Sequence, residues 1–318
     1  MRAVVLTETG GPERLELQDV PRPSPGPGQL LIRAAAAGVS YAETQIRAGT
    51  LPFPLTLPAV IGAEAVGEVV GTGEGVDGAL LGTTRVGVTG GVGSYAEYVL
   101  MPAAMTCPVP DGLNPLDALA AAAPGALALA LLHRAALRGG ESVLVEAATS
   151  SVGTQLVRHA KEFGAARVIA TAGSAAKRER AAELGADLVL DHGSPEWPAG
   201  LPDDVDVAFE AIGGPAARQV LDHLTPGSGR MLHYGLLSGE PAAVTAADLV
   251  QRGVTLVGCG GPGWAGQVFG THYPEVLERL ASGRTRAFVD RTLPLEEAAE
   301  AHRLLEGRAV TGRVLLVP

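Results

Sequence analysis

The chain has 318 residues, enough for about two domains that each bury a core of their own. Hydrophobic residues make up 47% of it, which excludes a low-complexity disordered chain, although its 43 Gly and 23 Pro predict many turns. A net charge of -10 and few aromatic residues argue against nucleic acid or anionic lipid as partners, and two cysteines exclude a disulfide framework and a four-cysteine zinc site.

The first hundred residues contain short apolar runs separated by turn residues. Clusters of Gly and Pro, such as Gly10-Gly11-Pro12, lie between these runs. We therefore expect an irregular, mostly antiparallel β domain with strands at residues 3–6, 15–20, 30–37, 65–70, 86–88 and 95–100.

The longest apolar run covers residues 118–132 and is interrupted by Pro124. A membrane-spanning helix needs about 20 apolar residues, so this shorter, Ala-rich run predicts a buried helix. The N-terminal residues alternate apolar and polar side chains and do not show the pattern of a signal peptide. With only two cysteines as well, we expect a cytoplasmic protein without a membrane partner.

After Pro115, short apolar strands alternate with amphipathic helical segments. Neighbouring parallel strands need a crossover between them, so this alternation predicts a doubly wound parallel sheet. The expected strands are residues 143–145, 168–170, 188–190, 205–209, 230–233 and 255–257, and the expected helices are 152–163, 175–184 and 216–224.

The C-terminal segment differs from this pattern. Residues 274–281 and 295–305 predict helices, and residues 313–317 predict a last strand. Because a six-stranded dinucleotide-binding sheet would be complete before residue 260, we expect this segment to return to the first domain.

The turn after the first strand of the parallel sheet is the candidate phosphate loop. A strand, a tight turn and a helix follow one another here, as in dinucleotide-binding proteins. The three positions of a Gly-x-Gly-x-x-Gly motif hold Ala148, Ser150 and Gly153, and Ser151 adds a second hydroxyl. Taken alone, the segment is equally compatible with an ordinary strand-to-helix turn capped by Ser.

The end of the second strand indicates which dinucleotide is preferred. An NAD-preferring site places Asp or Glu there to hold the ribose hydroxyls, but no carboxylate precedes Glu179. Ser174, Lys177 and Arg178 can instead hold a 2′-phosphate, which favours NADPH over NADH. The alternative is that Lys177 and Arg178 form a solvated helix face.

Several segments together resemble the zinc-independent quinone oxidoreductases of the medium-chain dehydrogenase/reductase (MDR) superfamily. Their order spans nearly the whole chain, which makes the resemblance more specific than one glycine motif. The matching segments are residues 9–13, 36–39, 93–99, 147–153, 294–302 and 312–316.

This resemblance implies an α/β fold in which a doubly wound parallel Rossmann sheet is inserted into a mainly β, chaperonin-10-like (GroES-like) catalytic domain. The implied domains are residues 1–118 (catalytic), 119–258 (NADP-binding) and 259–318 (the return to the catalytic domain). NADPH would lie between the domains. The implied reaction is hydride transfer to a small-molecule quinone or α,β-unsaturated carbonyl compound, commonly by a homodimer.

The resemblance also argues against a catalytic metal. The zinc branch of the superfamily would carry its Cys and His ligands near Ser40 and Ala63, and neither side chain is an ordinary zinc ligand. Ser40 follows Gly38-Val39, where zinc-free relatives typically have Asn. It can still donate a hydrogen bond to a substrate carbonyl or to the nicotinamide ribose.

Ser40 and Tyr41 are the catalytic candidates. An enone gains negative charge on its carbonyl oxygen as hydride arrives, so a hydrogen-bond donor at that oxygen speeds the reaction. Solvent is the expected proton source. Tyr41 has an alternative role as a core aromatic residue.

The resemblance further implies cofactor contacts at the carboxyl ends of the parallel strands. His192 is either a partner of the adenosine phosphate or a plain loop histidine, and Arg313 either reaches cofactor phosphate or simply begins an edge strand. The remaining expected contacts are Thr149, Ser150, Ser151, Val152, Gly153, Ile212, Tyr234, Gly235 and Leu236.

Two other functions remain open. An enoyl-thioester reductase of polyketide-type biosynthesis would use the same hydride chemistry, although the acidic charge balance argues mildly against a coenzyme A substrate. A non-catalytic NADPH-binding protein is also compatible with the Ser-rich loop and the substituted Asn.

Overall fold

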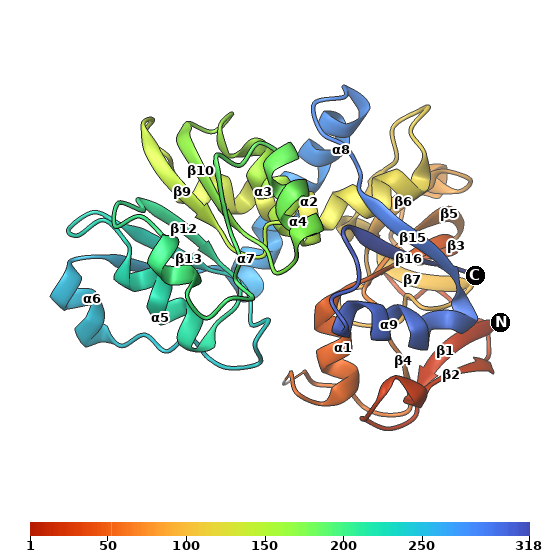
Figure 1. Cartoon of the computed structure of the whole chain (residues 1–318). Helices are drawn as coiled ribbons and strands as arrows, with labels where there is room; N and C mark the ends of the chain where they lie inside the picture. Colours follow the sequence, from red (N-terminus) through yellow and green to blue (C-terminus); the bar gives the residue numbers. More distant parts are fainter. Residues whose placement is uncertain (52) are drawn as a thin grey trace. The chain divides into compact units, whose positions relative to one another are not determined.

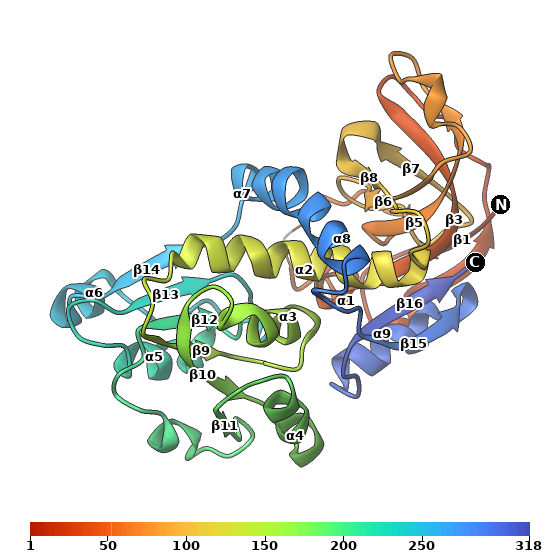
Figure 2. The ribbon, with the colours of Figure 1, turned by 90° about the horizontal axis from the view of Figure 1, so that it is seen from above.

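The computed structural model describes residues 1–51 and 53–318, and the chain divides into two compact units. Unit 1 comprises Met1–Ala123 and Phe269–Pro318, and unit 2 is the intervening segment, Pro124–Val268. Both chain termini therefore belong to unit 1, and both views show them side by side (Figures 1 and 2).

Unit 1 is built mainly from antiparallel strands. Three strands form a small sheet in the order β2 (Leu15–Asp19), β1 (Arg2–Leu6) and β4 (Ala59–Val60). The larger sheet has the order β15 (Val289–Pro294), β16 (Arg313–Val317), β3 (Gln29–Val39), β5 (Glu64–Thr72), β6 (Thr84–Val88) and β8 (Thr106–Pro108), and β7 (Tyr98–Pro102) also pairs with β3. The helices lying wholly in this unit are α1 (Tyr41–Ala48), α8 (Tyr273–Ala281) and α9 (Ala298–Glu306).

The C-terminal segment completes the larger sheet of unit 1. Strand β16 pairs antiparallel with β3, with Val314 opposite Val39 and Leu316 opposite Ala37. The same apolar side chains of β16 pack in one buried cluster with Val4 and Leu6 of β1. The expected return of the tail to the first domain is therefore found as direct strand pairing.

Unit 2 contains one parallel sheet with helices on both faces. Along β9, Val143 and Val145 pack in a cluster with α2 and α3, whereas Leu144 packs in another cluster with α5 (Figure 2). Successive side chains of a strand point to opposite faces, so three consecutive buried apolar residues such as Val143 to Val145 must be covered on both faces. This confirms the prediction of a doubly wound sheet.

All six strands of this sheet run parallel. Their order is β11 (Leu188–Leu190), β10 (Ala165–Thr171), β9 (Glu141–Val145), β12 (Val207–Glu210), β13 (Arg230–His233) and β14 (Thr255–Gly258). The helices of the unit are α3 (Ser151–Ala160), α4 (Ala175–Glu183), α5 (Gly214–Asp222), α6 (Ala246–Arg252) and α7 (Pro262–Gln267). The order reverses between β9 and β12, which makes this pair the topological switch point where doubly wound sheets bind ligands.

Helix α2 (Pro115–Ala135) is the one described helix that is long and apolar enough to cross a membrane by length and composition. Within its most apolar stretch, however, 72% of the residues are buried inside the protein. Such burial is what a core helix shows, as the sequence predicted. Pro124 lies inside the helix without ending it.

The unit boundaries differ from the expected ones. The sequence placed them at residues 118/119 and 258/259, whereas the compact units meet at 123/124 and 268/269. Both the expected and the observed first boundary lie inside α2, so the two units are joined there by one continuous helix. The second difference arises because α7 still belongs to unit 2.

Candidate functional site

The turn between β9 and α3 has the geometry of a dinucleotide loop. Ala147 adopts a left-handed conformation with φ of 47°, and the amide of Ala148 donates to the carbonyl of Thr171 at 3.0 Å. Ser150 caps α3, because its hydroxyl accepts from the amide of Gly153 at 3.0 Å. The structure confirms the Ser-capped strand-to-helix turn, and a dinucleotide loop uses the same geometry.

Gly153 is required by close packing between helix and loop. A Cβ atom at this position would lie 2.3 Å from the carbonyl oxygen of Ala147, so no side chain fits. The amides of Ser151 and Val152 precede the first intrahelical donor of α3 and point beyond its N-terminus, where anions bind. The close contact at Gly153 and the Ser150 cap therefore leave these two amides as backbone donors at the start of α3.

The loops after β10 and β11 bring together the residues expected at a 2′-phosphate. Ser174 caps α4 by accepting from the amide of Lys177 at 3.3 Å. His192 Nδ1 lies 3.1 Å from Thr171 Oγ1, so this histidine is held against the end of β10. It is therefore an anchored residue and not a freely solvated loop histidine.

Arg178 has a partner that the sequence did not predict. Its Nη1 atom lies 2.5 Å from Oδ2 of Asp191, which directly follows β11. The two side chains are 31% and 39% exposed, so solvent screens the pair and it contributes about 0–1 kcal/mol. The sequence analysis considered only the second strand of the parallel sheet and the turn after it, where no carboxylate precedes Glu179. Asp191 was missed because it follows the neighbouring strand, β11.

The loops after β12 and β13 support each other. The amide of Leu237 donates to the carbonyl of Ala211 at 2.9 Å, and the amide of Ser238 donates to that of Ile212 at 2.8 Å. A Cβ at Gly235 would lie 2.8 Å from the Ala211 carbonyl oxygen. The sequence analysis explained glycines at these strand ends by the close approach of a dinucleotide. Gly235, however, is already required by its contact with the loop after β12.

Tyr234 presents its hydroxyl to the protein interior. The hydroxyl oxygen is buried and has no hydrogen-bond partner among the described residues. Burial, followed by the charges of Glu146 and Glu210, raises the pKa of the phenol. A cofactor contact expected from this residue would therefore come from its backbone.

Two buried carboxyl groups at the switch point were missed by the sequence analysis. Glu146 directly follows β9 and Glu210 ends β12, and the two residues are 1% and 0% exposed. Burial, followed by the charge of Glu210, raises the pKa of Glu146 well above its ordinary value. The sequence did contain a signal for these two residues, because each Glu stands at the carboxyl end of an apolar strand.

In unit 1, the buried carboxyl group of Glu43 connects the backbone at Ser40 with the backbone at Ala63, next to α1. Glu43 Oε2 accepts from the amide of Ser40 at 2.7 Å, and its Oε1 accepts from the amide of Ala63 at 2.8 Å. The hydroxyl of Tyr95 also donates to Oε2 at 2.9 Å. Glu43 thereby fixes the backbone on both sides of the candidate catalytic segment.

The neighbouring catalytic candidate, Tyr41, begins α1 and is partly exposed, which speaks against its alternative role as a core aromatic residue. The buried aromatic in this region is instead Tyr95, at 0% exposure. Its hydroxyl lies 3.2 Å from Nε2 of His302, and burial lowers the pKa of this histidine to about 3. His302 is therefore neutral and serves the buried network of unit 1.

The comparisons with known proteins cover the whole chain. Residues 26–111 match the family model described as alcohol dehydrogenase GroES-like domain, and residues 151–282 match the one described as zinc-binding dehydrogenase. A 2-haloacrylate reductase from a Burkholderia species is 31% identical over 99% of this chain and 98% of its own length. The quinone oxidoreductase of Pseudomonas aeruginosa is 30% identical over 97% of each protein.

A solved structure agrees with these relatives. The crystal structure of Escherichia coli quinone oxidoreductase complexed with NADPH superimposes with a TM-score of 0.91, at 27% identity over 100% of both chains. The chain belongs to the medium-chain dehydrogenase/reductase superfamily as a member of quinone oxidoreductase type. The predicted GroES-like and Rossmann domains are confirmed.

Arg313 of this MDR protein has a structural partner in unit 1. Its Nη2 atom donates to Oε1 of Glu64 at 2.7 Å, and both side chains are buried. A Cβ at Gly38 would lie 2.6 Å from Nη2, so the guanidinium also fills the space beside β3. The alternative of an edge strand is wrong, because β16 lies between β15 and β3, and the expected phosphate contact competes with this internal pair.

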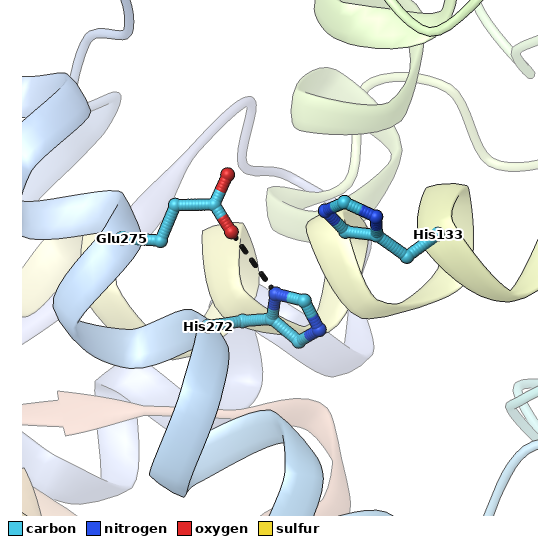
Figure 3. Close-up of side chains that lie close together, drawn as sticks. All are labelled: His133, His272 and Glu275. Carbon is cyan, nitrogen blue, oxygen red and sulfur yellow. Dashed lines mark hydrogen bonds and ion pairs between the residues drawn. The ribbon is translucent and has the colours of Figure 1, made fainter.

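A second ion pair of unit 1 lies at the start of α8. His272 Nδ1 is 3.1 Å from Oε2 of Glu275, as Figure 3 shows. Glu275 also accepts from Arg279 Nε at 3.1 Å, one turn further along the helix. The carboxylate of Glu275 therefore links the first two turns of α8.

Substitution of Arg313 separates its two possible roles. We expect Arg313→Ala to lower the free energy of unfolding by about 3–5 kcal/mol, because Glu64 would remain buried without its partner. Urea denaturation measures this change, and Arg313→Lys, which keeps the charge, should lose less. Unchanged stability combined with a much weaker NADPH affinity would instead assign Arg313 to the cofactor.

Proposed function

We propose that the protein is an NADPH-dependent, metal-free reductase that transfers hydride to a quinone or to an α,β-unsaturated carbonyl compound. The observation that carries this proposal is the loop between β9 and α3, with its Ser cap and the close contact at Gly153. The NADPH complex of the structurally similar E. coli enzyme supports the choice of cofactor. The two related proteins named for quinone and haloacrylate reduction support the choice of substrates.

Several residues of unit 2 are suited to hold NADPH. The amides of Ser151 and Val152 would hold the pyrophosphate, and Thr149 and Ser150 complete that loop. Ser174, Lys177, Arg178 and His192 would hold the 2′-phosphate, while the backbone at Ile212 and at Tyr234, Gly235 and Leu236 lines the remaining strand ends. When bound, the nicotinamide supplies the hydride, and the protein supplies binding and orientation.

Unit 1 supplies the substrate side of the reaction. Ser40 and Tyr41 donate hydrogen bonds to the oxygen on which negative charge develops, and solvent delivers the proton. Glu43 holds Ser40 in place through its amide, with a donor-acceptor distance of 2.7 Å. Ser40 and Ala63 stand where a zinc enzyme needs Cys and His, so the proposed reaction uses no zinc at these positions.

Steady-state NADPH oxidation tests this function. We expect turnover with benzoquinone, naphthoquinone or a simple enone, and unchanged rates after treatment with a strong chelator. Activity restricted to enoyl thioesters would favour the polyketide-type alternative, and NADPH binding without turnover on any acceptor would favour the non-catalytic one. Absence of NADPH fluorescence enhancement at saturation would contradict the whole proposal.

The pair of Arg178 and Asp191 allows a finer test of cofactor choice. Asp191→Asn removes a carboxylate that competes with the 2′-phosphate for the guanidinium. Since an exposed pair contributes up to about 1 kcal/mol, we expect NADPH to bind about fivefold more tightly, with NADH affinity nearly unchanged. Fluorescence titrations with both dinucleotides measure this, and Lys177→Ala/Arg178→Ala should weaken NADPH binding alone. Equal changes for both cofactors would place the phosphate elsewhere.

We further propose a cytoplasmic homodimer in which a second copy pairs along β14. Among the described residues this strand has no partner on its outer side, and Val250 of the adjacent α6 is 82% exposed. Unpaired edges and exposed apolar side chains favour association. Light scattering should give about twice 32.3 kDa, and Val250→Glu should lower that mass at limiting concentration. A wild-type monomer would contradict the dimer.

A further inference from the structure

Glu146 and Glu210 form a buried pair of carboxyl groups at the switch point of unit 2. Their strands, β9 and β12, are hydrogen-bonded neighbours, with Val145 opposite Phe209 at their carboxyl ends. Glu146 is held beside this end because its amide donates to the Phe209 carbonyl at 3.2 Å. The pair therefore lies beneath the crevice where a doubly wound sheet receives its ligand.

Glu210 is surrounded by hydrogen-bond donors. Its Oε1 accepts from the amide of Ile212 at 2.7 Å and from that of Gly213 at 2.6 Å. Its Oε2 lies in hydrogen-bonding contact with Nδ1 of His233, which directly precedes the loop after β13. One carboxylate thus fixes the turn after β12 and is connected to the turn after β13.

Glu146 and Glu210 each come one residue after the register pair Val145–Phe209, and both side chains are buried, so the two carboxyl groups are close neighbours inside the protein. Two ionised carboxylates are both acceptors and repel each other, so a hydrogen bond between them requires a proton on one of them. Because Glu210 already accepts from two amides, the proton belongs on Glu146. Glu146 Oε2 is buried and has no hydrogen-bond partner among the described residues, so no cation is hydrogen-bonded to this oxygen in place of the proton.

The groups facing the pair come from each neighbouring strand. The end of β13 contributes His233 and, directly after it, the buried hydroxyl of Tyr234. The end of β10 contributes Thr171, an uncharged residue whose carbonyl and hydroxyl accept from the turn after Glu146. His233 is the one among these groups that can carry a positive charge, and it contacts Glu210.

We propose that Glu146 and Glu210 are positioning residues for the cofactor, which hold the Ile212–Gly213 turn in its binding form only while they share one proton. This inference rests on the proposed function, because Ile212 belongs to the expected NADPH site. Loss of the shared proton would leave two negative charges in contact inside the protein. Glu210 would then have to turn toward water and release the two amides that it holds.

The direction of the pH effect follows from the burial of Glu146. Its pKa in the folded protein lies above the ordinary value of 4.5, so the folded form holds the proton more tightly than the unfolded chain does. The stabilising contribution is therefore complete below about pH 4.5 and is lost as the pH rises through the folded-state pKa. The hydrogen bond to Glu210 also raises the pKa of His233, which gives the same direction.

The decisive experiment compares NADPH dissociation constants of wild type and Glu146→Gln across pH. The Gln amide donates to Glu210 at every pH, so it mimics the protonated acid permanently. We expect wild-type affinity to fall by about tenfold per pH unit above the pKa of Glu146, whereas Glu146→Gln keeps its low-pH affinity. Since both proteins titrate against the same NADPH, protonation of the ligand cancels in the ratio.

Glu141→Gln is the matched control. Glu141 begins the same strand at its opposite end and pairs with Arg230, so its loss should leave the pH profile of NADPH binding unchanged. Thermal unfolding of the cofactor-free protein gives an independent readout. Glu146→Gln should match wild type in acid and exceed it in alkaline buffer.

Infrared spectroscopy of the wild type observes the shared proton directly. The C=O stretch of a protonated carboxylic acid should be present at the pH where NADPH affinity is highest and disappear as that affinity falls. Absence of this band at that pH, or an affinity ratio that does not vary with pH, would overturn the inference. Failure of the wild type to bind NADPH at any pH would instead overturn the proposed function.

Discussion

The pairing of β9 with β12 is the constraint on which the cofactor half of this protein depends. These two strands are neighbours in the sheet, yet the chain continues from them to opposite sides, so their carboxyl ends open a crevice. The turn before α3 and the turn before α5 both begin at this point. The same pairing brings Glu146 against Glu210 and links cofactor binding to a buried acid pair.

Unit 1 depends on a comparable constraint, the closure of its sheet by β16. Arg313 and Glu64 meet across a sequence separation of 249 residues and neutralise each other in the interior. Glu43 performs a related task beside α1, where one carboxylate holds two backbone amides and a tyrosine hydroxyl. Glu43 is satisfied by several donors, whereas Glu64 and Arg313 are joined by one hydrogen bond inside the protein, and each contact specifies one arrangement of the backbone around it.

Most of the fold was predictable from the sequence because local patterns determine it. The strand Arg230–His233 and the last strand Arg313–Val317 were expected with these bounds, since an apolar run flanked by turns has few alternatives. Gly153 was recognised as a close-packing position for the same local reason.

The charged contacts were not predictable in this way. The pairs Arg178–Asp191, Glu146–Glu210 and Arg313–Glu64 each join residues from different strands, and a single sequence carries no record of which strand ends meet. Consequently the strand, turn and helix of the candidate cofactor loop were predicted, while the charged partners around it were missed and the role of Arg313 was assigned without its buried partner.

The split composition of unit 1 has a consequence for synthesis on the ribosome. Unit 2 is complete once Val268 has emerged, whereas the larger sheet of unit 1 still lacks β15 and β16 at that point. Strand β3, which is translated early, pairs with β7 along its first half, but residues 37–39 stay uncovered on that side until β16 has emerged. The unit that begins first is therefore completed after the unit inserted into it, and nascent chains carry an open sheet position during the interval.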